Sequence, residues 1–279
     1  MKLFEFAPAK INLALHVRRR EADGYHVLET MFVFADVGDT VGWEGDEDGV
    51  SLAVDGPFAG GLAGEGDNLV LRAARALAKA AGVRRGAALR LTKRLPVASG
   101  MGGGSADAAA TLRLLNSIWE LGFPRAKLAE IGAELGADVP ACVHAVPLRG
   151  DGRGERLVPI AFEGSWAVLA NPGTAVSTRA VFAAWDGVDR GALVPGDGMA
   201  AALAGRNDLE PTAMLLAPVI GDVLAQLRVQ PGARLVRMSG SGATCFALFA
   251  TPEAARLAAV AIAVRAPGWW VEACRLAET

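Results

Sequence analysis

The alternation of hydrophobic and polar positions predicts strands in both halves of the chain. Residues 11–17 and 27–37 are rich in β-branched and aromatic side chains, and a polar stretch ending in Asp23 and Gly24 separates them. This pattern predicts two strands joined by a loop. Similar alternation predicts further strands over residues 87–92, 166–170, 234–238, 244–249 and 269–273.

Apolar residues at helical spacing predict several helices between these strands. The clearest covers residues 68–81, with Asp67 or Asn68 as its N-terminal cap. A helix over 125–135 is expected to stop at Gly136, because glycine suits the left-handed position after a helix. Other helices are predicted over 105–121 and 177–185, over two stretches within 209–227, and over 252–264, where the uncharged run 257–264 indicates a buried helix.

These elements and the chain length together predict the architecture. A chain of 279 residues exceeds the size at which one hydrophobic core usually stops growing, so two lobes are expected, although one large domain is the alternative. Strands mix with helices in both halves, and the hairpin-like pairs argue against a purely parallel sheet, which predicts two α+β lobes. The glycine-rich, aperiodic stretch 148–155 suggests a boundary between lobes 1–152 and 153–279.

Composition and charge exclude several classes of protein. Hydrophobic residues make up 52% of the chain and charged residues 21%, which argues against disorder, and the net charge of −2 provides no general attraction to nucleic acid or to an anionic membrane. The three cysteines lack C-x-x-C spacing, so neither a disulfide framework nor a zinc site is indicated. We expect a cytoplasmic protein without a signal peptide or membrane span, since the apolar run 257–264 is too short to cross a bilayer.

A glycine-rich segment directly before the predicted helix 105–121 is the strongest candidate for a binding site. Glycines at 100, 102, 103 and 104 let the backbone approach a ligand closely, and the free amides and dipole of a helix N-terminus favour phosphate. Ser105 is expected to cap the helix or contact phosphate. A P-loop is excluded because no lysine follows the glycines, and a dinucleotide fingerprint is disfavoured. A flexible turn without function is the alternative.

Two charged residues are candidates for catalysis, each with a structural alternative. Lys10 lies in a strand patterned for burial, where a lysine needs a counter-charge or a cleft, and the alternative is an exposed residue on an edge strand. Asp138 precedes Pro140, and from the sequence alone a role in capping a turn is favoured over catalysis.

Aromatic residues, histidines and a second glycine cluster complete the candidates. Tyr25, the only tyrosine, is placed to stack on a base, or else it is a half-buried strand residue. The three histidines lack metal-binding spacing, so a structural role is favoured for each. The cluster 239–242 predicts either a tight hairpin turn or a second backbone wall beside the phosphates.

Four segments, 8–12, 96–110, 136–140 and 239–243, occur in the order of the motifs of the GHMP kinase superfamily, which the chain resembles from residue 3 to about 275. Within it, the sequence Asp23-Gly-Tyr-His26 with Leu28 and Thr30, together with residues 93–96, is similar to the kinases that act on cytidylyl-methylerythritol in non-mevalonate isoprenoid synthesis. The resemblance implies a two-lobed GHMP kinase-type α+β fold with the active site in the cleft between the lobes.

The resemblance also implies a reaction and a set of site residues. ATP, with Mg²⁺ bridging its phosphates, would transfer its γ-phosphoryl group to the 2-hydroxyl of 4-diphosphocytidyl-2-C-methyl-D-erythritol, with Lys10 and Asp138 as the catalytic pair. The positions implied to bind ATP are Pro96, Val97, Ala98, Ser99, Gly100, Met101, Gly102, Gly103, Gly104, Ser105, Ala106, Ser239, Gly240 and Gly242. Those implied to border the cytidylyl substrate are Asn12, Tyr25, His26, Lys93, Thr178 and Phe182. No side chain is assigned to the metal, for which Ser105 is only a candidate.

Some features depart from the family pattern, and some alternatives stay open. Met101 and Ala106 stand where relatives often carry leucine and serine, and the segment 149–155 is longer than usual and receives no ligand contact. We expect a monomer or weak homodimer with a small-molecule substrate and no nucleic-acid or membrane partner. The alternatives are a kinase acting on homoserine or a mevalonate-type alcohol, and a nucleotide-binding protein without catalytic activity.

Overall fold

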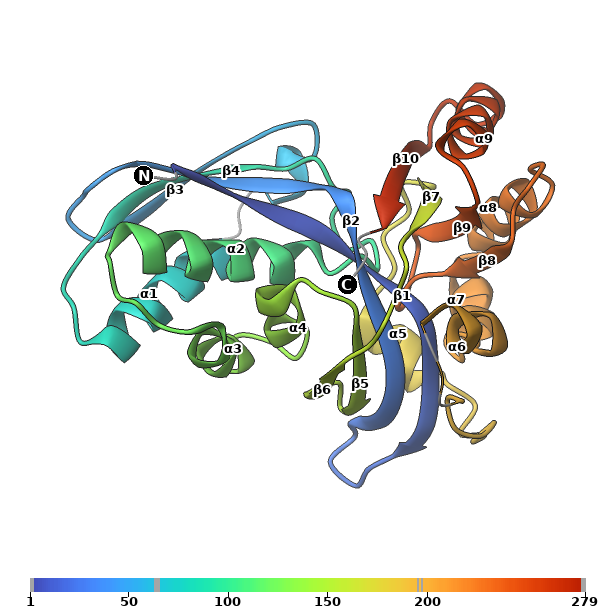
Figure 1. Cartoon of the computed structure of the whole chain (residues 1–279), viewed down its shortest axis with the longest axis horizontal. Helices are drawn as coiled ribbons and strands as arrows, with labels where there is room; N and C mark the ends of the chain where they lie inside the picture. The colour runs from blue at the N-terminus through green and yellow to red at the C-terminus, as the bar shows by residue number, and fades with distance from the viewer. Residues whose placement is uncertain (1–2, 63–65, 195, 197, 277–279) are drawn as a thin grey trace. The chain divides into compact units, whose positions relative to one another are not determined.

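A computed structural model of the chain describes residues 3–62, 66–194, 196 and 198–276, which form two compact units interleaved along the sequence (Figure 1). The first unit contains the segments up to Ala9, Gly38–Val97 and Gly102–Ala145, and the second contains Lys10–Val37, Ala98–Met101 and the chain from Val146 onward. The expected single division after residue 152 differs from this arrangement. Residues 10–37 join the C-terminal part because the strand that begins at His26 pairs with strands from that part.

Two long strands contribute to both units. β1 (Phe4–Arg20) and β2 (His26–Gly45) include the two strands predicted at the N-terminus and extend beyond them. The loop between them contains Asp23 and Gly24, as expected, and Gly24 adopts a positive φ of 86°.

The sheet of the second unit is antiparallel. Its strands follow the order β2-β10-β7-β9-β8, where β10 is Trp270–Leu276, β7 is Ser165–Asn171, β9 is Cys245–Phe249 and β8 is Leu235–Met238. The predicted hairpin around residues 239–242 is confirmed, because β8 and β9 pair antiparallel. β5 (Leu148–Gly152) and β6 (Arg156–Pro159) form a hairpin that pairs with β2 (Figure 1). The sequence pattern did not predict this hairpin, because glycine and charged residues conceal its alternation.

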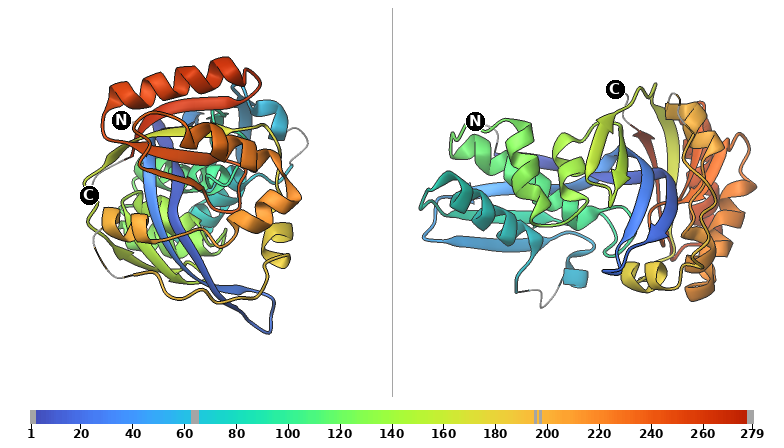
Figure 2. Two further views of the ribbon diagram at one scale, coloured as in Figure 1. Left: turned by 90° about the vertical axis from the view of Figure 1, so that its right-hand side faces the viewer. Right: turned by 90° about the horizontal axis from the view of Figure 1, so that it is seen from below.

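Helices pack on this sheet and enclose its core. They are α5 (Thr178–Ala183), α6 (Gly198–Ala204), α7 (Glu210–Leu216), α8 (Val219–Arg228) and α9 (Pro252–Arg265). Figure 2 shows α9 running alongside β10. Buried side chains from α8, α9 and β9 share one hydrophobic cluster that includes Leu224, Phe249 and Ile262. Burial of such apolar surface is the main source of folding stability.

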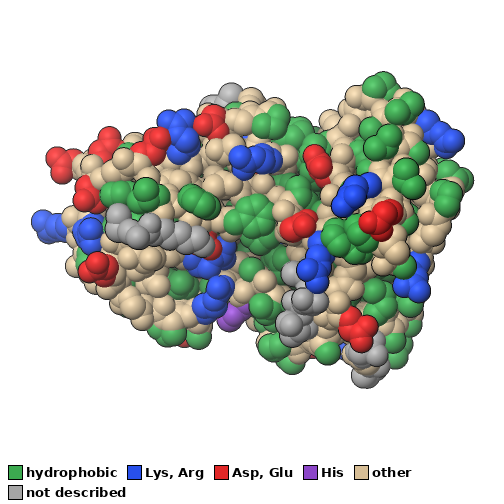
Figure 3. All heavy atoms as spheres, turned by 45° about the horizontal axis from the view of Figure 1, so that its top comes forward, with side chains coloured by type: hydrophobic (Ala, Val, Ile, Leu, Met, Phe, Trp, Pro, Cys, Tyr) green, Lys and Arg blue, Asp and Glu red, His purple; other side chains and the backbone are tan. Residues whose placement is uncertain are grey.

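The prediction of a buried helix over 257–264 is wrong. The buried side of α9 consists of Ala255, Ala258 and Ile262, whereas Leu257, Val260 and Val264 are exposed. Both sides of the helix are apolar, so the sequence pattern cannot show which side faces the core. Hydrophobic side chains are visible at the surface in this region, and on the same face basic and acidic side chains are interspersed (Figure 3).

The first unit places its helices on one face of a small sheet (Figure 1). β3 (Val50–Asp55) pairs parallel with β4 (Ala87–Thr92), which pairs antiparallel with β2. The helices are α1 (Leu69–Ala81), α2 (Gly103–Ile118), α3 (Arg125–Ala133) and α4 (Val139–His144), with a short 3₁₀ turn at Ala59–Leu62. The predicted cap of α1 is confirmed, because the Asn68 side chain accepts a hydrogen bond from the Val70 amide at 2.8 Å.

Two helix ends in this unit differ from the predictions. α2 begins at Gly103, with Gly102 as its N-terminal cap in the left-handed region (φ 63°), so Ser105 lies inside the first turn and is not the cap. α3 ends at Ala133, and Gly136 is not among the glycines with positive φ. The short helix α4 follows and was not predicted, because six residues are too few for a periodic signal. Within the described residues, no helix is both long and apolar enough to span a membrane.

Candidate active site

In the second unit, residues 98–101 of the glycine-rich loop contact the turn between β8 and β9. The Ser239 hydroxyl donates to the Gly100 carbonyl at 3.0 Å, and the Thr244 amide donates to the Ser99 carbonyl at 3.0 Å. Gly100 has φ 77°, and a β-carbon at this position would lie only 2.4 Å from the Ser239 carbonyl oxygen. Only glycine fits this position without displacing its neighbours.

Lys10 lies beside these clusters and is buried. Its side chain is 3% exposed, which removes the alternative of an exposed lysine on an edge strand. The ammonium donates to the Asn12 amide oxygen at 3.0 Å and lies 4.4 Å from the centre of the Phe32 ring. The Lys10 backbone amide donates to the Met101 carbonyl at 2.9 Å, so β1 is joined directly to the glycine-rich loop.

Asn12 fixes the position of the Lys10 ammonium. Its backbone amide donates to the Ser239 hydroxyl at 3.1 Å, and its side-chain amide donates to the Thr30 hydroxyl at 2.8 Å. Thr30 in turn donates to the Ala14 carbonyl at 2.7 Å. β1, β2 and the turn after β8 therefore hold the Lys10 amine through a continuous set of buried hydrogen bonds, which are favourable when every group has a partner.

In the first unit, a buried lysine joins the elements that precede and follow the glycine-rich loop. The Lys93 ammonium lies 2.5 Å from an Asp39 oxygen and 2.9 Å from an Asp107 oxygen, and all three side chains are at least 97% buried. The other Asp39 oxygen accepts the backbone amides of Arg94 and Leu95 at 2.6 and 2.9 Å. Lys93 thereby links β2, the end of β4 and the first turns of α2.

Burial affects the protonation of Asp107 and Lys93. Desolvation raises the pKa of Asp107 to about 7, although the Lys93 charge opposes the shift. Burial alone would lower the pKa of Lys93, but the two carboxylates outweigh it and raise that pKa above its ordinary value. The second Asp107 oxygen is buried and has no hydrogen-bond partner. Because the charged carboxylate is costly to desolvate, Asp107 binds a proton more readily than an exposed aspartate does.

The start of α2 is shaped to accept an anion. The first backbone amides of a helix have no partner within it, and the helix dipole places partial positive charge there. Gly102 turns the chain into α2, and a β-carbon at Gly103 would lie 3.3 Å from the Lys93 ammonium. Met101 and Ala106, which depart from the family pattern, are both fully buried.

Asp138 also belongs to the first unit, whereas Lys10 belongs to the second. Asp138 precedes α4, and its carbonyl accepts from the Cys142 amide at 3.1 Å, but its side chain makes no capping hydrogen bond to the helix. The Asp138 side chain therefore does not cap α4, and its predicted role in the turn before Pro140 stays a prediction.

An aromatic group in the second unit contains two of the residues predicted to border the substrate, His26 and Phe182. The His26 ring centre lies 5.0 Å from that of Phe182 and 5.6 Å from that of Trp185, the latter edge-on. Tyr25 is 60% exposed at the tip of the β1–β2 hairpin, which excludes the alternative of a half-buried strand residue. Sequence reasoning missed Trp185, because an isolated tryptophan in a helical pattern carries no specific signal.

Arg20 determines the tautomer of the His26 ring and contributes to its lack of charge. Its guanidinium donates to His26 Nε2 at 3.2 Å and to the carbonyls of Phe182 and Ala183 at 3.1 and 2.9 Å. This hydrogen bond assigns the proton of the neutral ring to Nδ1. Burial and the charge of Arg20 lower the pKa of His26, so the ring is neutral at pH 7 with Nδ1 as a donor. His16, by contrast, accepts from the Arg206 amide and bonds the Gly191 carbonyl, as a structural histidine does.

Thr178, at the start of α5, lies 2.8 Å from the Ser241 hydroxyl. Because α5 also carries Phe182, this contact joins the aromatic group to the 239–242 turn.

The predicted site residues are divided between the units. The first unit carries Lys93, Pro96, Val97, Gly102, Gly103, Gly104, Ser105, Ala106 and Asp138. The second carries Lys10, Asn12, Tyr25, His26, Ala98, Ser99, Gly100, Met101, Thr178, Phe182, Ser239, Gly240 and Gly242. No three or more His, Cys, Asp or Glu side chains of the described residues are grouped to hold a metal ion.

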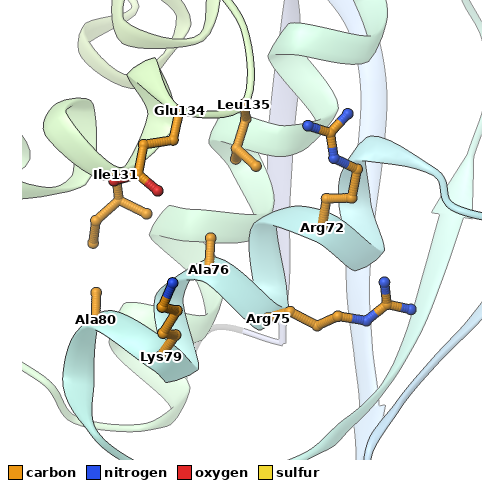
Figure 4. A pocket seen from close by; sticks show the side chains of 8 residues that line it. All are labelled: Arg72, Arg75, Ala76, Lys79, Ala80, Ile131, Glu134 and Leu135. Atoms are coloured by element: carbon orange, nitrogen blue, oxygen red, sulfur yellow. The ribbon is translucent and has the colours of Figure 1, made fainter.

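A separate pocket of about 480 Å³ lies between α1 and the end of α3 in the first unit (Figure 4). Its walls include Arg72, Arg75 and Lys79 from α1 and Glu134 after α3. None of the predicted site residues lines this pocket, so it is distinct from the groups described above.

Comparisons with known proteins identify the family. The model for the GHMP kinase N-terminal domain matches residues 68–145, and the model for the GHMP kinase C-terminal domain matches residues 195–265. A 4-diphosphocytidyl-2-C-methyl-D-erythritol kinase of Rhizorhabdus wittichii is 56% identical over 277 residues, covering 98% of this chain and 94% of the relative.

Solved structures agree with this grouping. The crystal structure of a 4-(cytidine 5'-diphospho)-2C-methyl-D-erythritol kinase superposes with a TM-score of 0.79 at 34% identity and covers 99% of this chain and 100% of its own. The homoserine kinase of Cytophaga hutchinsonii, at 20% identity, has a TM-score of 0.75 over 100% of this chain and 96% of its own, a likeness of fold alone. The fold is therefore that of a small-molecule kinase. The chain belongs to the GHMP kinase family, and within it groups with the relatives named 4-diphosphocytidyl-2-C-methyl-D-erythritol kinase.

Proposed function

We propose that this chain uses ATP to phosphorylate the 2-hydroxyl of 4-diphosphocytidyl-2-C-methyl-D-erythritol, a step in making isoprenoid precursors without mevalonate. The near full-length similarity to relatives with that name supports the reaction. The observation that carries the choice of substrate is the group formed by His26 and Phe182 with the exposed Tyr25 nearby in sequence, because aromatic rings suit a nucleobase.

ATP binds through backbone groups of the glycine-rich loop. We propose that residues 96–106 surround its phosphates and that Ser239, Gly240 and Gly242 form a second wall, as the backbone contacts at Gly100 support. Mg²⁺ would supply positive charge that offsets the negative charge of the ATP phosphates. Among the residues at the start of α2, Ser105 has the hydroxyl oxygen suited to such a hard cation.

Lys10 and Asp138 carry out the proton transfer. In a loose phosphoryl-transfer transition state the alcohol loses its proton late, so a carboxylate is a sufficient base. We propose that Asp138 accepts this proton and that the Lys10 ammonium orients the hydroxyl. The buried bonds of Asn12 fix the Lys10 side chain in advance, which lowers the entropy lost in reaching the reactive geometry.

The base is recognised by stacking and by one directed hydrogen bond. Tyr25 and Phe182 stack on cytosine, and His26 Nδ1–H donates to N3 on the edge of the base. Uracil presents an N–H at position 3, so a donor aimed at N3 selects against it. Thr178 borders the same substrate beside Phe182.

Lys93 contributes through its ion pairs. Its ammonium already contacts Asp39 and Asp107, so we propose that it borders the substrate site by holding α2 against β4 beside the loop.

An assay of substrate choice tests the proposal. The purified protein with ATP and Mg²⁺ is expected to release ADP only when the cytidylyl substrate is present, and not with homoserine or mevalonate. Turnover of either alcohol at a comparable kcat/KM would favour the alternative kinases, and no turnover with any of them would favour a nucleotide-binding protein without activity. We further propose a cytoplasmic monomer or weak homodimer, in agreement with three buried cysteines that form no disulfide.

A further inference from the structure

The β5–β6 hairpin, which the proposed reaction leaves without a role, reaches the loop that carries Tyr25. β5 pairs with β2 in a register that places Gly152 opposite Leu28 and Asp151 opposite Glu29. Because β2 begins at His26, the turn that follows Gly152 lies beside the tip of the β1–β2 hairpin (Figure 1). This turn belongs to the segment 149–155, to which the family resemblance assigns no ligand contact.

Arg153, in this turn, makes three contacts with the β1–β2 loop. Its guanidinium carbon lies 4.2 Å from the centre of the Tyr25 ring, within the range of a cation–π interaction. Its Nη2 donates to the Glu21 carboxylate at 2.9 Å and also to the Asp23 carboxylate. A planar guanidinium can stack on a ring and bind carboxylates at its edge, which a lysine cannot do equally well.

The loop itself is arranged to present both carboxylates to Arg153. The Glu21 amide donates to the Tyr25 carbonyl at 2.7 Å, and the Tyr25 amide donates to an Asp23 oxygen at 3.1 Å. The Tyr25 amide and then Arg153 lower the pKa of Asp23, so the carboxylate is charged at pH 7. The two carboxylates therefore hold Arg153 at Nη2 while its guanidinium carbon lies over the Tyr25 ring.

These contacts leave one side of the Tyr25 ring for a ligand. An aromatic ring has two faces, the guanidinium lies over one of them, and the residue as a whole is 60% exposed. A tyrosine at a hairpin tip without such support would sample several rotamers and lose that freedom on binding. We propose that Arg153 is a positioning residue that holds Tyr25 ready to stack on the base, and this inference rests on the proposed function.

Kinetics of matched variants test this role. Arg153→Ala is expected to raise the KM for the cytidylyl substrate about 3- to 10-fold, in line with a cation–π contact at a partly exposed site. The kcat and the KM for ATP should stay within about twofold, because Arg153 contacts neither the glycine clusters nor Lys10. Arg153→Lys should recover part of the affinity. Arg156→Ala, an exposed arginine in the same hairpin, is the control and should leave all three constants unchanged.

The same measurements in a Tyr25→Ala background distinguish failure of the positioning role of Arg153 from failure of the proposed base site. If Arg153 acts through the ring, Arg153→Ala adds no further increase in KM once Tyr25 is removed. An effect of Tyr25→Ala alone, with Arg153→Ala silent, would overturn the positioning role and leave the proposed function intact. If Tyr25→Ala leaves the KM unchanged, the proposed base site and the positioning role both fail. If Arg153→Ala lowers kcat and raises both KM values by similar factors, the substitution disrupts the structure in general. That result would also overturn the positioning role.

Discussion

Replacing Gly100 by alanine should impair ATP use more than it impairs folding. The position has φ 77°, and left-handed backbone costs a non-glycine residue roughly 1–2 kcal/mol. The new β-carbon would lie 2.4 Å from the Ser239 carbonyl oxygen and 2.8 Å from that of Gly242. Because the interior is close-packed, the two backbones must separate by at least about 0.6 Å, and such overpacking typically costs about 1–3 kcal/mol.

The expected total is a loss of about 2–5 kcal/mol in the free energy of unfolding, less than the whole stability of many domains. The folded variant would have displaced walls around the phosphates, and a shift of this size can lower kcat/KM for ATP by about 10- to 100-fold. Urea unfolding and steady-state kinetics at saturating cytidylyl substrate measure the two effects. Thermal or urea midpoints alone do not separate them.

Gly82→Ala is the matched control. Gly82 follows α1 with φ 66°, but a β-carbon there would meet nothing within 4 Å. It should therefore show only the left-handed strain and an unchanged KM for ATP. If Gly100→Ala matches this control in both stability and KM, the backbone contact between the two glycine clusters does not shape the ATP site.

Three further predictions concern proton transfer, base choice and pH. Asp138→Asn should lower kcat by about 10²- to 10⁴-fold while ATP still binds in calorimetry; an equal loss of binding would indicate misfolding. A uridylyl analogue of the substrate should show a kcat/KM about 10- to 100-fold lower in competition assays, from one lost hydrogen bond and one unpaired donor, and equal use of both bases would contradict the role of His26. Burial raises the pKa of Asp107 from 3.8 to about 7, so the folded state binds its proton more tightly than the unfolded state does. The associated stability is lost as pH rises from about 4 to about 7 and then levels off. Asp107→Asn should flatten this part of the pH profile in urea unfolding, and an unchanged profile would refute the assignment.

The sequence predicts the elements better than it predicts what each contacts. The strands and helices with clear periodicity, such as α1 with its Asn68 cap, form where expected. The β5–β6 hairpin was missed because its register depends on pairing with β2, which no local pattern reveals. The exposure of α9 was also missed, because Leu257 and Ile262 look alike in sequence although only one faces the core.

The candidate site shows the same limit. Residue type and order were enough to select Lys10 and the glycine clusters, but not the hydrogen bonds through Asn12 that bury the amine. The partners of Lys93, at positions 39 and 107, are separated from it by long stretches of chain and only folding brings them together. The sequence did not predict a role for Arg153, because the proposed role depends on its contact with the Tyr25 ring.

Phosphorus NMR of a single incubation tests the proposed reaction most directly. With the purified protein, ATP, Mg²⁺ and 4-diphosphocytidyl-2-C-methyl-D-erythritol, a new phosphomonoester signal should grow in step with ADP while the signals of the substrate diphosphate persist. Formation of ADP without that phosphomonoester, or cleavage of the diphosphate instead, would contradict the transfer of phosphate to the 2-hydroxyl.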